Sequence, residues 1–510
     1  MHKLIITLKQ HTPIIHFQHD QDGATLRASE VKPKLDRYIL TKLGENPDQK
    51  EIKSIKEKWE KKKENKGKNF YNFFSNLTTY EKGILIAKYR DWLIGEGEHP
   101  ALNYKMKISP GVDMEELQTY EMNVPEKRRN RNTNQDEIRR KYSRKYGRQI
   151  PLLTSYPLFF GNMDIDYESD NAEIKRLAFA SYVYMDLIFL GRNERTPLPD
   201  IFTKESICEF LLKTNFGSRQ SKGFGSFYVD EEDEDWYIEP STVYSFNINV
   251  EDDDIEDEFN TLFNNIDLFY KTLRGGVNLK DWGGNTIFYF KSLAFMYAKD
   301  VLIAHWDKRA VKEQFYNYRR FDRDGVEIDS LPKQVDEHGE DCELLTIHFD
   351  QSYDIRDLLG FSTDEQWMSF KDSIEKKCAI VTGGRPRFPN RNEALPVERM
   401  QSPLLFKPIY NEDDDSYTIF LVFQDDKVGM DSFKRQQKIC FYSKNEKDTN
   451  GRPKRFMLDI PNVFSLQGYF DYIFNILRFD ISTHVETQYH HSKEYQILEN
   501  IYSQLKTKSK

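Results

Sequence analysis

The stretch NFGSRQSKGFGSF, residues 215–227, decides the fold because it places a glycine-rich loop between two regular elements. The segment before it, KESICEFLLKTN at 204–215, has the apolar spacing of an amphipathic helix. The segment after it, SFYV at 226–229, is predicted to be a short strand. The loop therefore connects a helix to a strand, the reverse of a nucleotide-binding P-loop, and it also lacks the GxxxxGK[ST] order.

The loop has the composition of an anion-binding segment. Glycine adopts backbone angles that other residues avoid and lets a ligand approach the main chain closely. Gly217, Gly223 and Gly225 are therefore expected to present backbone N–H groups to phosphate oxygens, while Arg219 and Lys222 supply charge. The spacing alone is equally compatible with a structural hairpin that joins a helix to a strand.

The elements around the loop predict an α+β sandwich, with helices on one face of an antiparallel sheet. Working outward, residues 3–9 alternate like a strand, and Pro33 could occupy the first turn of a helix that includes 34–40. Strand-like stretches follow at 104–108 and 177–190. With the helix at 204–215 and the strand at 226–229, the order is strand, helix, strands, helix, strand.

A second α+β region is expected beyond an acidic run at 251–258. Its predicted elements are a helical segment at 285–306 and strands at 343–349 (ELLTIHF), 402–410 (SPLLFKPIY) and 417–423 (YTIFLVF). A chain of 510 residues is long for one core, since domains typically hold about 100–200 residues. We therefore expect two domains, 1–250 and 251–510, with a boundary near 240–260.

Charge is distributed in blocks, although the net charge is −9. Residues 127–148 hold ten Lys or Arg against two acids, whereas 230–235, 251–258 and 412–415 are acidic and expected to be solvated loops. Insertions are expected at about 41–70, an exposed helix or flexible segment rather than core, and at about 110–150. Residues 127–148, which we call the basic arm, are either a solvated insertion or a contact to RNA or an acidic partner. The segment TGGRPRFPNRN at 382–392 is either a second RNA or subunit contact or an ordinary loop.

The composition excludes several classes of protein. The longest apolar run, LAFASYVYMDLIFLG, is interrupted by Asp186 and is shorter than the roughly 20 residues of a membrane span. Four cysteines lie far apart without a CxxC pair, so neither a zinc knuckle nor a disulfide framework is indicated. We expect a globular protein of the reducing cytoplasm.

Four segments resemble the RAMP superfamily, the repeat-associated proteins of CRISPR systems. FLLKTNFGSRQSKGFGSFYV at 210–229 resembles its signature, an apolar helix followed by G-x-R-x-x-[KR]-G-F-G-S and a strand. TPIIHFQHDQDGATLRASEVKPKLDRYI at 12–39 is similar to the first strand and helix, and YPLFFGN at 156–162 to the segment before the middle strands. QSPLLFKPIYNEDDDSYTIFLVF at 401–423 resembles a strand of the two-domain head subunit of the Cmr (type III-B) complex.

The resemblance implies two ferredoxin-like (RRM-like) domains and a non-catalytic subunit that caps the 3′ end of the crRNA filament and helps to capture target RNA in antiviral defence. The partners would be crRNA, target RNA and other RAMP subunits. RNA held through phosphates and 2′-hydroxyls needs donors and cations, and single-stranded RNA adds stacking on aromatic rings. Two features depart from the family, because HFQHDQDG replaces its glycine-rich end of the first strand and KLDRYI replaces its aromatic first helix.

The candidate RNA-binding residues, some from the loop and some from the first helix by analogy, are Arg27, Ser29, Lys32, Lys34, Arg37, Gly217, Ser218, Arg219, Ser221, Lys222, Gly223, Phe224 and Gly225. Alternative roles are a buried ring for Phe224 and a solvated helix face for the first-helix cations. The residues of a secondary RNA or partner contact are Lys127, Arg128, Arg129, Arg131, Arg139, Arg140 and Lys141.

Two other functional classes remain open. Some RAMP relatives cleave CRISPR RNA without metal, with an N-terminal histidine as general base, and His11, His16 and His19 lie near Asp20 and Asp22. The same histidines have no defensible spacing for zinc, so no metal and no cofactor is expected. The third class is an assembly protein that contacts neighbouring subunits and never RNA.

Overall fold

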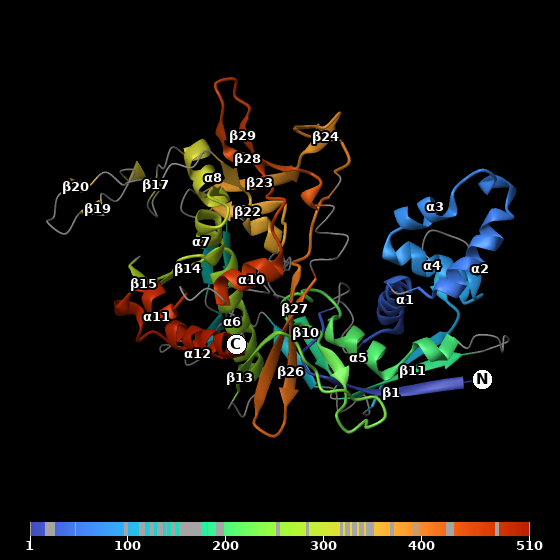
Figure 1. Ribbon diagram of the computed structural model, residues 1–510. Coiled ribbons are helices and arrows are strands. Elements are labelled where there is room, and N and C mark those ends of the chain that lie inside the picture. Colours follow the sequence, from blue (N-terminus) through green and yellow to red (C-terminus); the bar gives the residue numbers. More distant parts are fainter. Residues whose placement is uncertain are drawn as a thin grey trace. The chain divides into compact units, whose positions relative to one another are not determined.

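The computed structural model divides the chain into two compact units (Figure 1). The first consists of 1–242, 248–263 and 406–420, and the second of 243–247, 264–405 and 421–510. The residues that the structure describes are 2–15, 26–45, 47–95, 100–111, 118–122, 127–129, 136–138, 140–143, 148–151, 175–180, 182–189, 198–250, 255–281, 285–316, 320–321, 327–328, 334–335, 341–342, 351–367, 372–390, 393–395, 397–424, 433–474 and 479–508. The domain limits 1–250 and 251–510 stay a prediction.

A four-stranded antiparallel sheet forms the centre of the first unit, in the order β12-β1-β11-β4. Its strands are β1 (His2–Gln10), β4 (Lys105–Pro110), β11 (Tyr182–Phe189) and β12 (Phe227–Val229). With helix α1 (Ala28–Glu45) after β1 and helix α5 (Lys204–Leu212) before β12, the element order is βαββαβ. The α+β prediction is confirmed, and the strand order is compatible with the ferredoxin-like one.

Helices α1 and α5 lie on the same side of the sheet (Figure 1). The alternation of β1 explains this layer, because Ile6 and Leu8 are fully buried while Ile5 is 52% exposed. Val31 and Leu35 of α1 and Phe210 of α5 belong to the same core cluster. Helix α1 begins at Ala28, so Pro33 lies inside the helix and not in its first turn as predicted.

The segment expected to be an exposed insertion at 41–70 contributes to a small core of its own. Its helices are α2 (Gln49–Glu60), the short η1 (Lys63–Asn65) and α3 (Phe70–Asn76), and α4 (Thr79–Tyr89) follows. Ile52, Ile55 and Trp59 of α2 pack with Phe70 and Ile86. These apolar residues recur at helical spacing, which the high lysine and glutamate content of the segment obscured.

The remaining strands of the first unit are short. They are β2 (Leu93–Ile94), β3 (Ala101–Leu102), β5 (Gln118–Met122), β6 (Lys127–Arg129), β7 (Asp136–Ile138), β8 (Arg140–Ser143), β9 (Arg148–Pro151) and β10 (Lys175–Phe179). The strand-like stretch 177–190 is thus two strands, β10 paired with β5 and β11 in the main sheet. The acidic run 230–235 forms turns, as expected, and Asp233 accepts a hydrogen bond from the backbone N–H of Thr7 (2.9 Å).

The second unit contains a six-stranded sheet in the order β16-β21-β29-β28-β23-β22. Its strands are β16 (His305–Trp306), β21 (Ser352–Tyr353), β22 (Asp364–Trp367), β23 (Asp372–Cys378), β28 (Lys438–Lys447) and β29 (Pro453–Asp459). Two of its pairings, β16 with β21 and β21 with β29, are parallel. This order differs from that of the first unit, so the ferredoxin-like part of the prediction stays a prediction here.

Several helices accompany this sheet. They are α6 (Ile255–Arg274), α7 (Leu293–Asp300), α8 (Asp307–Tyr316), α10 (Leu466–Phe474), α11 (Ile481–His484) and α12 (Lys493–Lys508), of which α6 begins within the first unit. The helix predicted over 285–306 is wrong in part, because Thr286–Phe290 form β15, paired with β14 (Val277–Lys280), and His305–Trp306 form β16. The Ser292 hydroxyl caps α7, which is why the helix begins only there.

The strands predicted at 402–410 and 417–423 are confirmed as β26 (Leu404–Asn411) and β27 (Ser416–Phe423). They belong to one sheet with β13 (Tyr244–Asn249). Residues 343–349 lie outside the described residues. The remaining short strands are β17 (Arg320–Phe321), β18 (Glu327–Ile328), β19 (Gln334–Val335), β20 (Asp341–Cys342), β24 (Ile380–Thr382) and β25 (Arg385–Arg387). Among the described residues, every helix is too short or too polar to cross a bilayer.

Candidate nucleic-acid interface

The glycine-rich loop is held against the segment that follows β1. The Ser218 N–H donates to the Ile15 carbonyl (2.6 Å) and the Gly225 N–H to the Pro13 carbonyl (2.8 Å). The Thr12 hydroxyl donates to the Gly223 carbonyl (2.7 Å) and accepts from the Ser226 N–H (2.9 Å). The loop is therefore a fixed part of the first unit's core.

Two of the loop glycines are required by close backbone approach. Gly217 has φ +78°, and a Cβ there would lie 2.6 Å from the Ile15 carbonyl oxygen. Gly225 has φ +67°, and a Cβ would lie 1.9 Å from the Phe216 carbonyl oxygen. Left-handed backbone without room for a side chain explains both glycines without any ligand.

Protein acceptors occupy the N–H groups of all three loop glycines, so phosphate binding by these groups stays a prediction without support from the structure. Gly217 donates to Glu30 Oε1 (2.5 Å), Gly223 to the Gln220 carbonyl (3.3 Å), and Gly225 to the Pro13 carbonyl. Only the Gly217 acceptor is an anion, and it comes from helix α1 of the same chain. The side chains of the loop are therefore its stronger candidates for contact with RNA.

Residues of β26 hold the other side of the loop. Lys407 is fully buried, and its ammonium donates to the carbonyls of Thr214 (3.0 Å) and Phe227 (2.7 Å), one at each end of the loop. Burial holds the Lys407 pKa well below its ordinary value. Asn215 donates to the Phe406 carbonyl (2.8 Å), and the Ser226 hydroxyl to the Pro408 carbonyl (2.6 Å). Sequence reasoning missed Lys407, although a lysine within the apolar run LLFKPIY was a visible signal.

Phe224 does not present a surface to a base. Its side chain is fully buried and its ring stacks on that of Phe263, with centroids 3.8 Å apart and an interplanar angle of 7°. A buried ring contributes apolar packing and leaves no face open. The prediction of base stacking on Phe224 is therefore corrected in favour of the core alternative.

The first-helix candidates divide into two groups. Lys32 donates to Asp36 (2.7 Å) and to the Leu102 carbonyl, while Lys34 donates to Glu30 (3.1 Å) and the Asn215 carbonyl. Burial lowers the Lys34 pKa, and Glu30 partly opposes this. These two lysines thus have structural partners. The second group differs in exposure: Arg27 is half-buried, Ser29 and Arg37 are exposed, and the Arg37 guanidinium lies 5.4 Å from the Tyr80 ring centre.

The outer side of the loop carries the remaining candidates. Ser218, Arg219, Ser221 and Lys222 are all partly exposed. Arg219 has φ +57°, the left-handed region that a residue with a Cβ occupies at a cost of about 1–2 kcal/mol. Lys222 forms a parallel β-bridge with Phe406, which fixes its backbone. The loop therefore holds one arginine and one lysine at its surface in defined positions.

His11 lies in the core beneath the loop and is only 4% exposed. Its Nδ1 accepts from the Tyr410 N–H (3.0 Å), so the neutral ring carries its proton on Nε2, which is buried and without a hydrogen-bond partner in the described structure. Burial, with smaller effects of Lys407 and Lys9, holds the His11 pKa well below its ordinary value. His16, His19, Asp20 and Asp22 lie outside the described residues.

The described residues of the basic arm form two pairs of short antiparallel strands. Lys127, Arg128 and Arg129 lie in β6, which pairs with β7, and Arg140 and Lys141 lie in β8, which pairs with β9. Arg131, Arg139 and the YPLFFGN segment lie outside the described residues. In the second unit, TGGRPRFPNRN includes the β24–β25 hairpin, and Arg387 pairs with Glu393 (2.5 Å).

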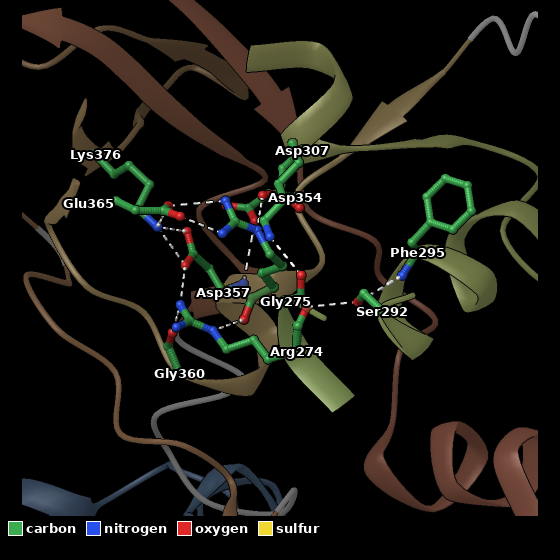
Figure 2. Close-up of polar contacts among 12 residues, drawn as sticks. Arg274, Gly275, Ser292, Phe295, Asp307, Asp354, Asp357, Gly360, Glu365 and Lys376 are labelled. Carbon is green, nitrogen blue, oxygen red and sulfur yellow. Dashed lines mark hydrogen bonds and ion pairs between the residues drawn. The ribbon is translucent and has the colours of Figure 1, made fainter. Parts of the chain in front are cut away.

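A second polar cluster lies buried in the second unit (Figure 2). Lys376 donates to both oxygens of Asp357 (2.7 and 2.8 Å), and Arg274 reaches the same carboxylate (3.2 Å). Arg356 pairs with Asp307 and Glu365. Figure 2 shows Lys376, Glu365 and Asp357 converging, while Ser292 bonds away from them toward Phe295 and the end of α6.

Most charged groups of this cluster have a partner of opposite charge, which explains how it stays buried. Asp307, Asp354, Asp357 and Glu365 face Arg274, Lys308, Arg356 and Lys376. Lys376 and Arg274 help to hold the Asp357 pKa below its ordinary value, against the effect of burial, whereas burial and the neighbouring carboxylates raise that of Asp354. Among the described residues, no group of His, Cys, Asp or Glu is arranged to hold a metal ion. The cluster therefore has the features of a structural ion network.

The helix, the glycine loop and the antiparallel sheet on which the loop packs define the class that the motif predicted, a RAMP protein of a CRISPR system. Two family models match nearly the whole chain, the Cmr1 N-terminal domain over residues 1–277 and the Cmr1 C-terminal domain over 289–501. The chain belongs to the Cmr1 family and is a subunit of a type III-B CRISPR complex, together with other subunits and RNA. No curated protein and no solved structure matches the chain.

Proposed function

We propose that this subunit is non-catalytic and binds RNA, capping the 3′ end of the crRNA and helping to capture target RNA. The capping role comes from the family resemblance. The observation that supports RNA binding is the left-handed backbone of Arg219 at the outer side of the loop, where glycine would be less strained. An arginine at such a strained position indicates a role for its guanidinium, and backbone phosphates are a suitable partner.

The proposed RNA contact also includes polar and basic residues beyond Arg219. Lys222 lies three residues further along the loop, and Arg27, Ser29 and Arg37 lie on α1, whose Glu30 and Lys34 both bond to the loop. Because the loop and the helix are joined in this way, their exposed donors are held in fixed relative positions. Preorganised donors lose less side-chain entropy when RNA binds.

The geometry of His11 supports the absence of cleavage. A general base must accept a proton from a 2′-hydroxyl within about 2.6–3.2 Å, yet Nδ1 of His11 is occupied by a backbone N–H and the ring is buried. The alternative is a metal-independent endoribonuclease that uses the N-terminal histidines. Product formation that disappears in His11→Ala, His16→Ala or His19→Ala would establish that alternative and refute our proposal.

Binding of the full chain to labelled single-stranded RNA across a salt series tests the RNA-binding proposal. Arg219→Ala with Lys222→Ala should weaken binding and reduce the slope of log affinity against log salt by about 1.4, since each phosphate contact to a single strand contributes about 0.7. The control, Lys105→Ala with Lys107→Ala, removes two exposed lysines from β4 of the same unit. Equal effects of the two pairs, or no effect of either, would refute the loop as an RNA contact and favour an assembly protein.

Duplex DNA should bind more weakly than single-stranded RNA in the same assay. The cytoplasmic location and the lack of a cofactor stay predictions.

A further inference from the structure

Residues 61–74 form a surface that the proposed function does not use. They comprise the turn KKKENKGKN after α2 and the first part of α3. We call them the 61–74 surface. Neither the glycine loop nor the candidate residues of α1 contribute to it.

The helices beneath this surface are well defined. The Asp48 side chain caps α2, the Asn69 side chain caps α3, and Thr78 and Glu81 form a capping box at α4. Trp59 and Phe70 lie in the small core between the helices. The side chains of the 61–74 surface are therefore presented by a folded support.

Two aromatic rings of α3 are exposed. Tyr71 is 50% exposed and Phe73 is 38% exposed. Both rings contact α2, since the Lys56 ammonium lies 4.7 Å from the Tyr71 ring centre and the Phe73 ring stacks on Trp59 with centroids 5.2 Å apart. Single exposed apolar residues are ordinary, but two rings that are each supported from one side offer platforms for stacking.

Positive charge is concentrated in the turn that leads into α3 and its rings. Lys61, Lys62, Lys63, Lys66 and Lys68 are all exposed, and the same turn contains one acid, Glu64. The whole chain has the opposite sign, with a net charge of −9. A local excess of lysines attracts a polyanion whatever the net charge of the protein.

Single-stranded RNA has the chemistry that this surface complements. Its phosphates pair with lysines, and its unstacked bases stack on aromatic rings. An acidic protein segment would use the lysines but would leave the two rings without a matching group. We propose that the 61–74 surface is a second contact for single-stranded RNA, with Tyr71 and Phe73 stacking on bases and the lysines of the turn binding phosphates.

Binding of the full chain to a short fluorescent oligouridine tests this proposal. Tyr71→Leu with Phe73→Leu keeps apolar contact with Trp59 but removes both rings, and should weaken binding by about 10-fold or more. Lys61→Gln, Lys62→Gln and Lys63→Gln together should reduce the salt slope by about 2. The matched control replaces three exposed lysines elsewhere, Lys299, Lys447 and Lys493, by glutamine.

Three results would overturn the proposal: affinity unchanged in the leucine variant, a control equal to the lysine variant, or equal competition by polyglutamate, which would indicate an acidic protein partner. Photocrosslinking of 4-thiouridine RNA to the wild-type chain gives a readout independent of variant folding, and it should label Tyr71 or Phe73. The Arg219→Ala, Lys222→Ala variant separates this proposal from the proposed function. If that variant binds normally while the leucine variant does not, the 61–74 surface stands and the glycine loop fails.

Discussion

Replacing Arg219 by glycine separates the strain of the loop from its function. At φ +57° the arginine costs the folded state about 1–2 kcal/mol, and glycine removes this cost. Glycine also gains about 0.5–1 kcal/mol of freedom in the unfolded chain. The net expectation for Arg219→Gly is a stabilisation of up to about 1.5 kcal/mol, which raises the melting temperature of a unit of this size by up to roughly 5 °C.

RNA affinity should change in the opposite direction. Arg219→Gly removes one phosphate contact, so the salt slope for single-stranded RNA should fall by about 0.7. Differential scanning fluorimetry and the salt series give the two measurements on one preparation. Gln437→Gly is the control, because Gln437 is exposed, uncharged and has φ +62°; it should melt higher and bind RNA normally. A lower melting temperature, or unchanged RNA binding, in Arg219→Gly would refute the reasoning.

Three other substitutions test the contacts around the loop and the buried ion network. His11→Gln should lessen the decline of stability at low pH, because the folded His11 pKa lies below the unfolded value of about 6.5. The wild type therefore loses up to about 1.4 kcal/mol of unfolding free energy per pH unit as pH falls below that value. Thermal melts of both proteins from pH 7.5 to 5 measure the difference. Gly217→Ala should lower the melting temperature by at least several degrees, since its Cβ would lie 2.6 Å from the Ile15 carbonyl oxygen. The control is Gly383→Ala, at a left-handed glycine with open space around it. Equal melting temperatures of the two variants would contradict the packing argument. Asp357→Asn should destabilise the second unit by about 3–5 kcal/mol, because Lys376 and Arg274 lose their shared carboxylate. Urea unfolding should show that adding Lys376→Met recovers part of this loss. If the unfolding free energies of the two single variants simply add in the double variant, the ion pair is refuted.

The elements that the sequence predicted well are those with strong local patterns. The alternation of β1 and the apolar spacing of α5 depend only on neighbouring residues. The segment 285–306 failed because its apolar residues run almost continuously, so periodicity could not separate β15 from α7. In α2, Ile52, Ile55 and Trp59 have helical spacing, but a lysine-rich composition favoured an insertion.

The loop shows the limit of such predictions for a functional site. Its glycines were recognised from sequence, but their N–H partners, Glu30 and the carbonyls of Pro13 and Gln220, depend on tertiary structure. The same holds for Phe224, since no local pattern distinguishes a ring that stacks on Phe263 from one that awaits a base. The sequence did identify Arg219 and Lys222 as the cations of the loop.

The contribution of residues 406–420 to the first unit has a consequence for biosynthesis. The ammonium that bonds to both ends of the glycine loop belongs to Lys407, which the ribosome adds 180 residues after Phe227. At about 5–20 residues per second, the loop waits roughly 10–35 seconds for that partner. During this interval the nascent first unit has unpaired carbonyls at Thr214 and Phe227, so a fragment that ends at 277 should be cleaved by proteases near 215–227 where the full chain resists. Translation of the second half thus completes the fold of the first.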